Sequence, residues 1–289
     1  MTKPMTMQQF FATFPSDDVC LDHLFKQRFG EIISCPKCKK TSKFHRLASE
    51  KAYSCQWCGH HIHPMVGTPF YNSHTSLQRW YYAMYLFSVT RHGVSAKELQ
   101  RQFGCSYKTA WRMGHKIREY MSEKDGTPPM DGDVEVDESY FGSAKPGGKR
   151  GRGAVGKTIV IGLQDRDGAM HTEIIPDVKR RTLHGVITEH VVEGSTVHTD
   201  ELHSYKGLEE HGYTHKRVRH GTGEYANDGS HVNTVEAFWL IVKRSIRSTH
   251  VSVSPKHLPK YLGEFEYRQN RRKVPRRMFL EMLAFRPAS

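Results

Sequence analysis

The sequence lacks any apolar run of about eighteen residues, which is the length that a membrane-spanning helix needs. Its first ten residues, MTKPMTMQQF, also lack the apolar core of a secretory signal peptide. We therefore expect a cytoplasmic protein with no membrane partner. In that reducing compartment the six cysteines are expected to be thiols or metal ligands, and disulfides are not expected.

Acidic residues are too few to balance the basic ones. The chain has 30 Asp and Glu against 43 Lys and Arg, a formal net charge of +13 and a pI near 9.5. Such a charge attracts polyanions, so double-stranded DNA is the expected partner and the expected location is nucleoid-associated. The 289 residues, 37% of them hydrophobic, suffice for roughly two or three domains with real cores.

Four cysteines occur in a spacing that is typical of metal sites. CPKC supplies Cys35 and Cys38, and CQWC supplies Cys55 and Cys58, with sixteen residues between the two motifs. Two CxxC turns that face each other give the tetrahedral set of soft ligands that Zn²⁺ prefers. A closed four-thiolate site leaves no position for water, so this zinc is expected to be structural.

Two helices, the second of them basic, are predicted after the zinc module. Ser95 and Glu98 form a capping-box pattern for a short helix that ends at Gly104, and a second helix follows from about residue 106 to 120. This arrangement resembles a helix-turn-helix that lays its second helix in the major groove. Helical hairpins are also common in proteins that never touch DNA. The basic residues of the second helix are Lys108, Arg112, Lys116 and Arg118.

A polar segment rich in Pro and Gly, residues 122–133, predicts a domain boundary. Beyond it, the patterns predict one strand, then two strands that form a hairpin, a helix, two more strands and a final helix. The expected domains are 1–70 (zinc ribbon), 71–125 (helix-turn-helix region) and 126–289 (catalytic region with a basic tail). A glycine-rich loop with Lys149, Arg150 and Arg152, and the tail with Arg244, Arg271 and Arg272, are candidate phosphate contacts.

Within that last region, VNTVEAFWLIVKRS predicts an amphipathic helix over 232–245. At roughly 100° per residue, Glu236 and Lys243 lie about 20° apart on one side. Phe238, Ile241 and Val242 are expected on the far side. An isolated Glu/Lys pair usually lies on a solvated helix face. A functional role for this pair therefore has to be argued from other motifs of the chain.

VEVDESYFG, HTDELHSYKGL and the 232–245 helix, preceded by the zinc ribbon, resemble bacterial insertion-sequence transposases of the DDE type with an ISXO-like catalytic domain. The resemblance implies an α/β (α+β) chain whose ribonuclease-H-like catalytic domain follows a zinc ribbon and a helix-turn-helix. It also implies DNA cleavage and strand transfer at terminal inverted repeats. Asp137, Asp200 and a third ligand on the helix would hold two Mg²⁺ or Mn²⁺ ions.

The sequence leaves the third ligand open between Glu236 and Asn233, which lie about 60° apart on the helix. Charge favours Glu236, because two divalent ions bring +4 and two aspartates offset only half of it. Lys243, nearly in line with Glu236, is then a candidate phosphate contact. Asp137 can instead be one of several solvated acids, and Asp200 can be a helix cap.

Two other functions fit the same motifs. A non-catalytic DNA-binding regulator would keep the zinc ribbon and the two helices, but it is expected to lose a metal ligand. A metal-dependent nuclease of the same fold would use the same carboxylates to cleave without joining. Because transposition brings two DNA ends together, we expect a homo-oligomer on DNA.

Overall fold

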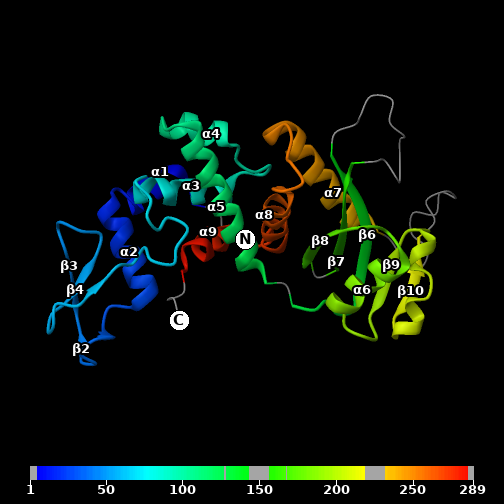
Figure 1. Cartoon of the computed structure of the whole chain (residues 1–289), viewed down its shortest axis with the longest axis horizontal. Coiled ribbons are helices and arrows are strands. Elements are labelled where there is room, and N and C mark those ends of the chain that lie inside the picture. The colour runs from blue at the N-terminus through cyan, green and yellow to red at the C-terminus, as the bar shows by residue number, and fades with distance from the viewer. Residues whose placement is uncertain (1–4, 127, 143–155, 167, 219–231, 286–289) are drawn as a thin grey trace. The chain divides into compact units, whose positions relative to one another are not determined.

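The computed structural model describes residues 5–126, 128–142, 156–166, 168–218 and 232–285 (Figure 1). The chain forms two compact units. The first contains residues 1–120 and 273–289, and the second contains residues 121–272. Among the described residues, no helix is both long and apolar enough to cross a membrane.

The first unit begins with two helices and a small cysteine-bearing ribbon. Phe25 of the second helix stacks on Tyr53 of the ribbon, with ring centroids 4.1 Å apart, so this helix supports one side of the ribbon. The elements are α1 (Met7–Thr13), α2 (Asp17–Phe29), β1 (Ile33–Ser34), β2 (Thr41–Ser42), β3 (Phe44–Arg46), β4 (Tyr53–Cys55) and β5 (His61–Ile62). β1 pairs with β2, and β3, β4 and β5 form an antiparallel three-stranded sheet.

The remaining helices of this unit are α3 (Leu77–Val89), α4 (Ala96–Phe103), the first part of α5 (Tyr107–Asp125) and α9 (Pro275–Leu283). Ser95 caps α4 by accepting a hydrogen bond from the backbone N–H of Glu98, and Gly104 ends α4 in the left-handed conformation. This start and this end are those expected from the sequence. α9 packs on α3, and its Phe279 lies among the rings of Phe10 and Tyr85.

The second unit is built on a five-stranded sheet of order β10-β9-β6-β7-β8. β6, β7 and β8 are antiparallel neighbours, whereas β9 is parallel to both β6 and β10. From β6 to α7 the order of strands and helices along the chain is the predicted one, and α8 follows as a helix that was not predicted. The elements are β6 (Asp133–Phe141), β7 (Thr158–Asp165), β8 (Met170–Ile175), α6 (Arg180–His190), β9 (Thr196–Thr199), β10 (Thr214–Arg217), α7 (Asn233–Ser245) and α8 (Leu258–Asn270). Short turns lie at His203–Tyr205 (η1), Leu208–His211 (η2) and Ile246–His250 (η4).

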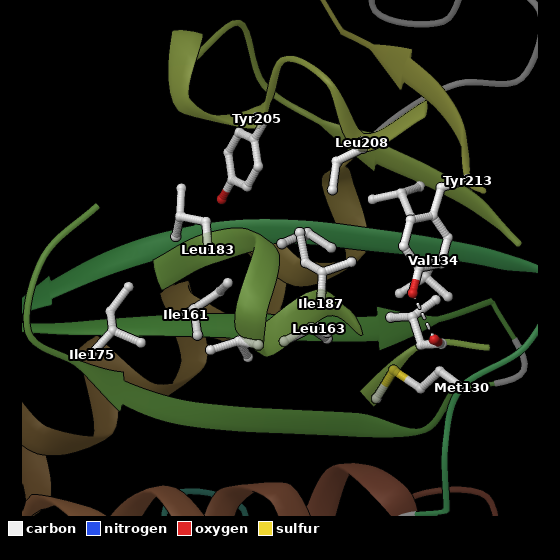
Figure 2. Packing of buried hydrophobic residues seen from close by; sticks show 14 residues of the cluster. Met130, Val134, Ile161, Leu163, Ile175, Leu183, Ile187, Tyr205, Leu208 and Tyr213 are labelled. Carbon is white, nitrogen blue, oxygen red and sulfur yellow. Dashed lines mark hydrogen bonds between the residues drawn. The ribbon is translucent and has the colours of Figure 1, made fainter. Parts of the chain in front are cut away.

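Alternation along the strands gives each face of this sheet its own core. Figure 2 shows one face, where Ile161 and Leu163 of β7 lie against Leu183 and Ile187 of α6. Tyr213 closes that core at one end and donates a hydrogen bond to the carbonyl of Val191, 2.9 Å away.

The opposite face is covered by α7, whose Phe238, Trp239 and Val242 are buried. Ile241 was expected among them, but 40% of it is exposed. Ile241 and its neighbour Leu240 are both exposed, so they lie outside the stripe of α7 that contacts the sheet.

Three segments differ from the sequence-based outline. α5 continues to Asp125, so the first residues of the expected linker are helical. Residues 273–289, expected with the catalytic region, belong to the first unit, because the apolar side of α9 packs on α3. The predicted basic loop with Lys149, Arg150 and Arg152 lies outside the described residues.

Candidate functional site

The four predicted metal-binding cysteines converge in the ribbon. Their Sγ atoms all lie within 4.8 Å of one another. Cys35 and Cys58 are 3.7 Å apart, and Cys38 and Cys55 are 3.9 Å apart. A tetrahedral site with Zn–S bonds of about 2.3 Å requires sulfur atoms about 3.8 Å apart. The cluster is therefore consistent with a structural zinc ion.

The turn after each CxxC motif explains why its two sulfur atoms point the same way. Lys39 and Gly59, which directly follow the two motifs, have left-handed φ values of 59° and 67°. The backbone N–H of Lys39 donates to the carbonyl of Cys35, and that of Gly59 donates to the carbonyl of Cys55. The hydroxyl of Ser42 lies 3.1 Å from the sulfur of Cys55. These contacts hold the thiols in place from outside the cluster.

Replacing Cys35 and Cys38 by Ser is expected to remove one equivalent of zinc and to unfold the ribbon, because zinc ligation supplies most of the folding free energy of so small a module. The structure limits the unfolding to about residues 31–63, since α2 also contacts α3 through the hydrogen bond from Tyr81 to the carbonyl of Cys20. Metal analysis and hydrogen exchange would measure both effects. Cys105→Ser, outside the cluster, is the control and should change neither.

The first two carboxylates of the proposed catalytic site belong to neighbouring parts of the sheet. β9 runs parallel to β6, and their pairing ends with Glu135 beside His198. Asp137 lies two residues further along β6, on the same face as Glu135, which is the face that α7 covers. Asp200 directly follows β9, and its charge contributes to raising the pKa of Asp137.

A missing side chain allows α7 to approach this pair. Gly162 is the cross-strand partner of Asp137 in β7. A Cβ atom at this glycine would lie 2.5 Å from Cζ2 of Trp239 and 2.9 Å from Cε of Met170. Only glycine leaves room for the indole, so this contact sets how closely the helix that carries Glu236 packs beside Asp137.

Glu135 fixes the beginning of α7. Its carboxylate accepts hydrogen bonds from the backbone N–H of Thr234 at 2.9 Å, the Thr234 hydroxyl at 2.9 Å and the backbone N–H of Val235 at 3.2 Å. Val232, the residue before the helix, has an apolar side chain and cannot cap it. A carboxylate from β6 therefore takes the role of the N-cap, where the helix dipole favours negative charge.

The burial of Glu135 corrects a sequence-based interpretation. The alternative for Asp137 was that it is one of several solvated acids, but its neighbours Glu135 and Glu138 are only 1% and 7% exposed. Glu138 lies on the other face of the sheet and accepts a hydrogen bond from the hydroxyl of Tyr205, 3.0 Å away. Strand alternation indicated which face each acid occupies, but no local pattern indicated its hydrogen-bond partners.

Replacing Glu135 by Gln is expected to lower the free energy of unfolding by about 2 kcal/mol, because charge-assisted bonds become neutral and an amide N–H₂ faces backbone donors. Chemical denaturation would measure this. Thr234→Val removes only the hydroxyl partner. In the double variant the two losses should be less than additive, and strict additivity would contradict the capping role.

Negative charge is concentrated around Asp137. Burial, followed by the carboxylates of Glu138, Asp200 and Glu236, raises the pKa of Asp137 to about 7. A divalent cation would offset this repulsion, and carboxylate oxygens are the hard ligands that Mg²⁺ and Mn²⁺ prefer. The donor set therefore fits the predicted ions.

The three carboxylates are neighbours without forming a closed ligand sphere. Among the described residues, the groups with ligand atoms within 4.8 Å of one another do not include Asp137, Asp200 and Glu236 together. Asn233 and Glu236 are both exposed on the first turn of α7. Asp200 also accepts a hydrogen bond from the backbone N–H of Leu202 at 2.8 Å, as a local turn would require.

Lys243 lies on the same side of the sheet. Its ammonium is 5.9 Å from the centroid of the Phe141 ring. Burial lowers the pKa of Lys243, and the charge of Asp137 counteracts part of this shift. A half-buried cation therefore lies within electrostatic reach of the carboxylates.

The other predicted basic contacts differ in exposure. Lys108 and Arg112 are exposed on α5, and Lys116 is half-buried. Arg118 points inward instead, donating to the carbonyl of Val94 at 2.7 Å. Arg271 is held within the second unit by Asp125, 2.6 Å away. Arg244 and Arg272 are exposed.

Two exposed aromatic residues of α5 had not been singled out in the sequence. Tyr107 and Trp111 are 47% and 37% exposed, and they lie one helical turn apart, next to Lys108 and Arg112. Their i, i+4 spacing on a basic helix is the sequence pattern that could have identified them.

Comparisons with known proteins relate this chain to transposases. Residues 129–270 match the ISXO2-like transposase domain, and residues 15–61 match the transposase zinc-ribbon domain. A protein of the transposable element ISH50 from Halobacterium salinarum is 30% identical over 278 residues, covering 89% of this chain and 92% of that protein. A transposase-like protein from Haemophilus influenzae is 30% identical over 105 residues, covering 36% of this chain and 84% of that protein.

A DDE transposase domain implies a ribonuclease-H-like fold, which agrees with the strand order of the second unit. The cysteine cluster lies within the segment that matches the zinc ribbon. The chain belongs to the family of ISXO2-like transposases, with an N-terminal zinc ribbon and a DDE catalytic domain.

Proposed function

We propose that this chain binds the terminal repeats of an insertion sequence and catalyses DNA cleavage and strand transfer there. The observation that carries the proposal is the convergence of Asp137, Asp200 and Glu236 from β6, the end of β9 and α7. Burial and the charge of Glu138 are the larger causes of the raised pKa of Asp137, and the charges of Asp200 and Glu236 add to it. Repulsion among these acids is unfavourable unless a cation is bound. A purely structural set of surface acids would have no reason to converge.

The three carboxylates would hold two Mg²⁺ or Mn²⁺ ions. Bound there, these ions supply activation of the attacking oxygen and stabilisation of charge on the leaving 3′ oxygen. Glu135 and Gly162 keep α7 against the sheet and so keep Glu236 near Asp137. Lys243 would contact a DNA phosphate beside the acids, which accounts for a lysine two turns after Glu236 on one helix.

Incubation of the full chain with Mg²⁺, a labelled terminal-repeat duplex and a target plasmid tests this proposal. Joined products support a transposase. Cleavage without joining would instead support a nuclease of the same fold. Binding without cleavage would support a non-catalytic regulator.

We also propose that α4 and α5 form the helix-turn-helix that recognises DNA. Recognition helices contact base edges with residues near their N-termini. In α5 these positions carry the exposed Lys108 and Arg112 beside Tyr107 and Trp111, whereas Arg118 points into the protein. Because two ends must be joined together, the DNA-bound form is proposed to be a homo-oligomer.

Replacing both Lys108 and Arg112 by Ala is expected to weaken terminal-repeat binding by about ten- to hundredfold, because phosphate and base contacts are lost. Fluorescence anisotropy at fixed salt would measure it. Arg101→Ala is the control, since this exposed residue of α4 pairs with Glu98. Equal losses in both variants would indicate a general charge effect and exclude α5 as the recognition helix.

A further inference from the structure

Two histidines and a glutamate cluster on the face of the sheet opposite Asp137. His171 and Glu173 are two residues apart in β8, so they project from the same face. Their cross-strand partners, Leu163 and Ile161, belong to the core that α6 covers (Figure 2). His190 is the last residue of α6. An edge strand and the end of its covering helix therefore bring the three side chains together.

The ligand atoms of this cluster are close enough to share one ion. One ring nitrogen of each histidine and one carboxylate oxygen of Glu173 all lie within 4.8 Å of one another. Nε2 of His190 is 3.7 Å from Oε2 of Glu173, and the centroids of the His171 and His190 rings are 4.0 Å apart. Ligands of a tetrahedral ion, at about 2.0–2.2 Å from the metal, lie at similar separations.

A ring nitrogen in the cluster lacks a hydrogen-bond partner. Nε2 of His171 is buried, and among the described residues no atom accepts from it or donates to it. Leaving a polar atom buried and unpaired costs free energy, so such an atom requires an explanation. A metal ion bound at this nitrogen would supply one.

The surroundings favour a cation with an open coordination position. The C-terminus of α6 carries partial negative charge, which adds to the charge of Glu173. The three side chains also line a cavity of about 400 Å³, together with Asp125 and Glu266. Water can therefore reach the cluster and complete the coordination shell.

We propose that His171, Glu173 and His190 form a second metal site, which binds Zn²⁺ or a similar divalent transition-metal ion. Imidazole nitrogens select such ions over Mg²⁺, so this site differs in chemistry from the carboxylates around Asp137. Three protein ligands and one water are a common zinc arrangement. The ion would fasten the edge strand β8 to the end of α6 and stabilise the second unit.

Zinc content of the full chain, measured after removal of loosely bound metal, tests the site. Wild type is expected to hold two equivalents of zinc, and His171→Ala one. His61→Ala is the matched control and should hold two, because Glu50, His61 and His63 form a comparable but fully exposed cluster. One equivalent in wild type, or loss of the second equivalent only in the control, would overturn the proposal.

Cobalt substitution gives a readout that distinguishes the two kinds of site. The four cysteines give thiolate-to-cobalt charge-transfer bands, whereas a site of two histidines and a glutamate gives only weak ligand-field bands. Glu173→Gln keeps the size of the side chain in case His171→Ala folds poorly. It should lose the weak ligand-field contribution of the second site, keep the bands of the four-cysteine site and lower the zinc-induced rise in melting temperature. Unchanged spectra and an unchanged melting shift in this folded variant would refute the site.

Discussion

Asp200→Asn is expected to lose cleavage and strand transfer by orders of magnitude while terminal-repeat binding persists. The substitution keeps the shape of the side chain but removes a charge beside Asp137. It also keeps the local turn, because the amide oxygen of Asn can still accept the hydrogen bond from the backbone N–H of Leu202. Single-turnover cleavage and end binding, measured on the same preparation, would separate the two effects.

The neighbouring acid provides the control for this variant. Glu201→Gln removes the same charge one residue later, from an exposed side chain. It should cleave like wild type, because Glu201 is exposed and is not among the acids whose charge raises the pKa of Asp137. Normal cleavage by Asp200→Asn would exclude Asp200 from the site and favour a purely structural role in the turn.

Local patterns were sufficient to predict much of the fold. Alternation from Val134 to Asp137 predicts β6 and assigns its two faces, and the capping residues Ser95 and Gly104 predict both ends of α4. The cysteine spacing predicts a cluster whose sulfur atoms do converge. Each of these features is set by residues near one another in the sequence, and for that reason it could be predicted.

Features that depend on distant contacts could not be predicted. Glu135 caps a helix that begins about a hundred residues later, and no local pattern distinguishes that role from solvation. Arg118 extends a basic helix in the sequence, but its contacts with Val94 and the Phe87 ring bury it. Likewise, the apolar side of α9 did not reveal that residues 273–289 belong to the first unit.

Glu236 and Asn233 are the two candidates for the third metal ligand. Glu236 contributes to the raised pKa of Asp137, so its carboxylate is within electrostatic reach of the site. Asn233 lies in the same first turn of α7 but carries no charge. Both side chains are exposed, so replacing either should leave the fold intact. Differences in activity can then be assigned to the chemistry of the site.

Glu236→Gln is expected to abolish strand transfer at any Mg²⁺ or Mn²⁺ concentration, whereas Asn233→Ala should weaken it only partly. A third carboxylate offsets the charge of two divalent ions far better than a neutral amide does. Strand-transfer assays across a metal titration would measure both variants, with end binding as the test of folding. If Asn233→Ala abolished transfer and Glu236→Gln only weakened it, Asn233 would be the ligand. Glu236 would then act on the site only through its charge.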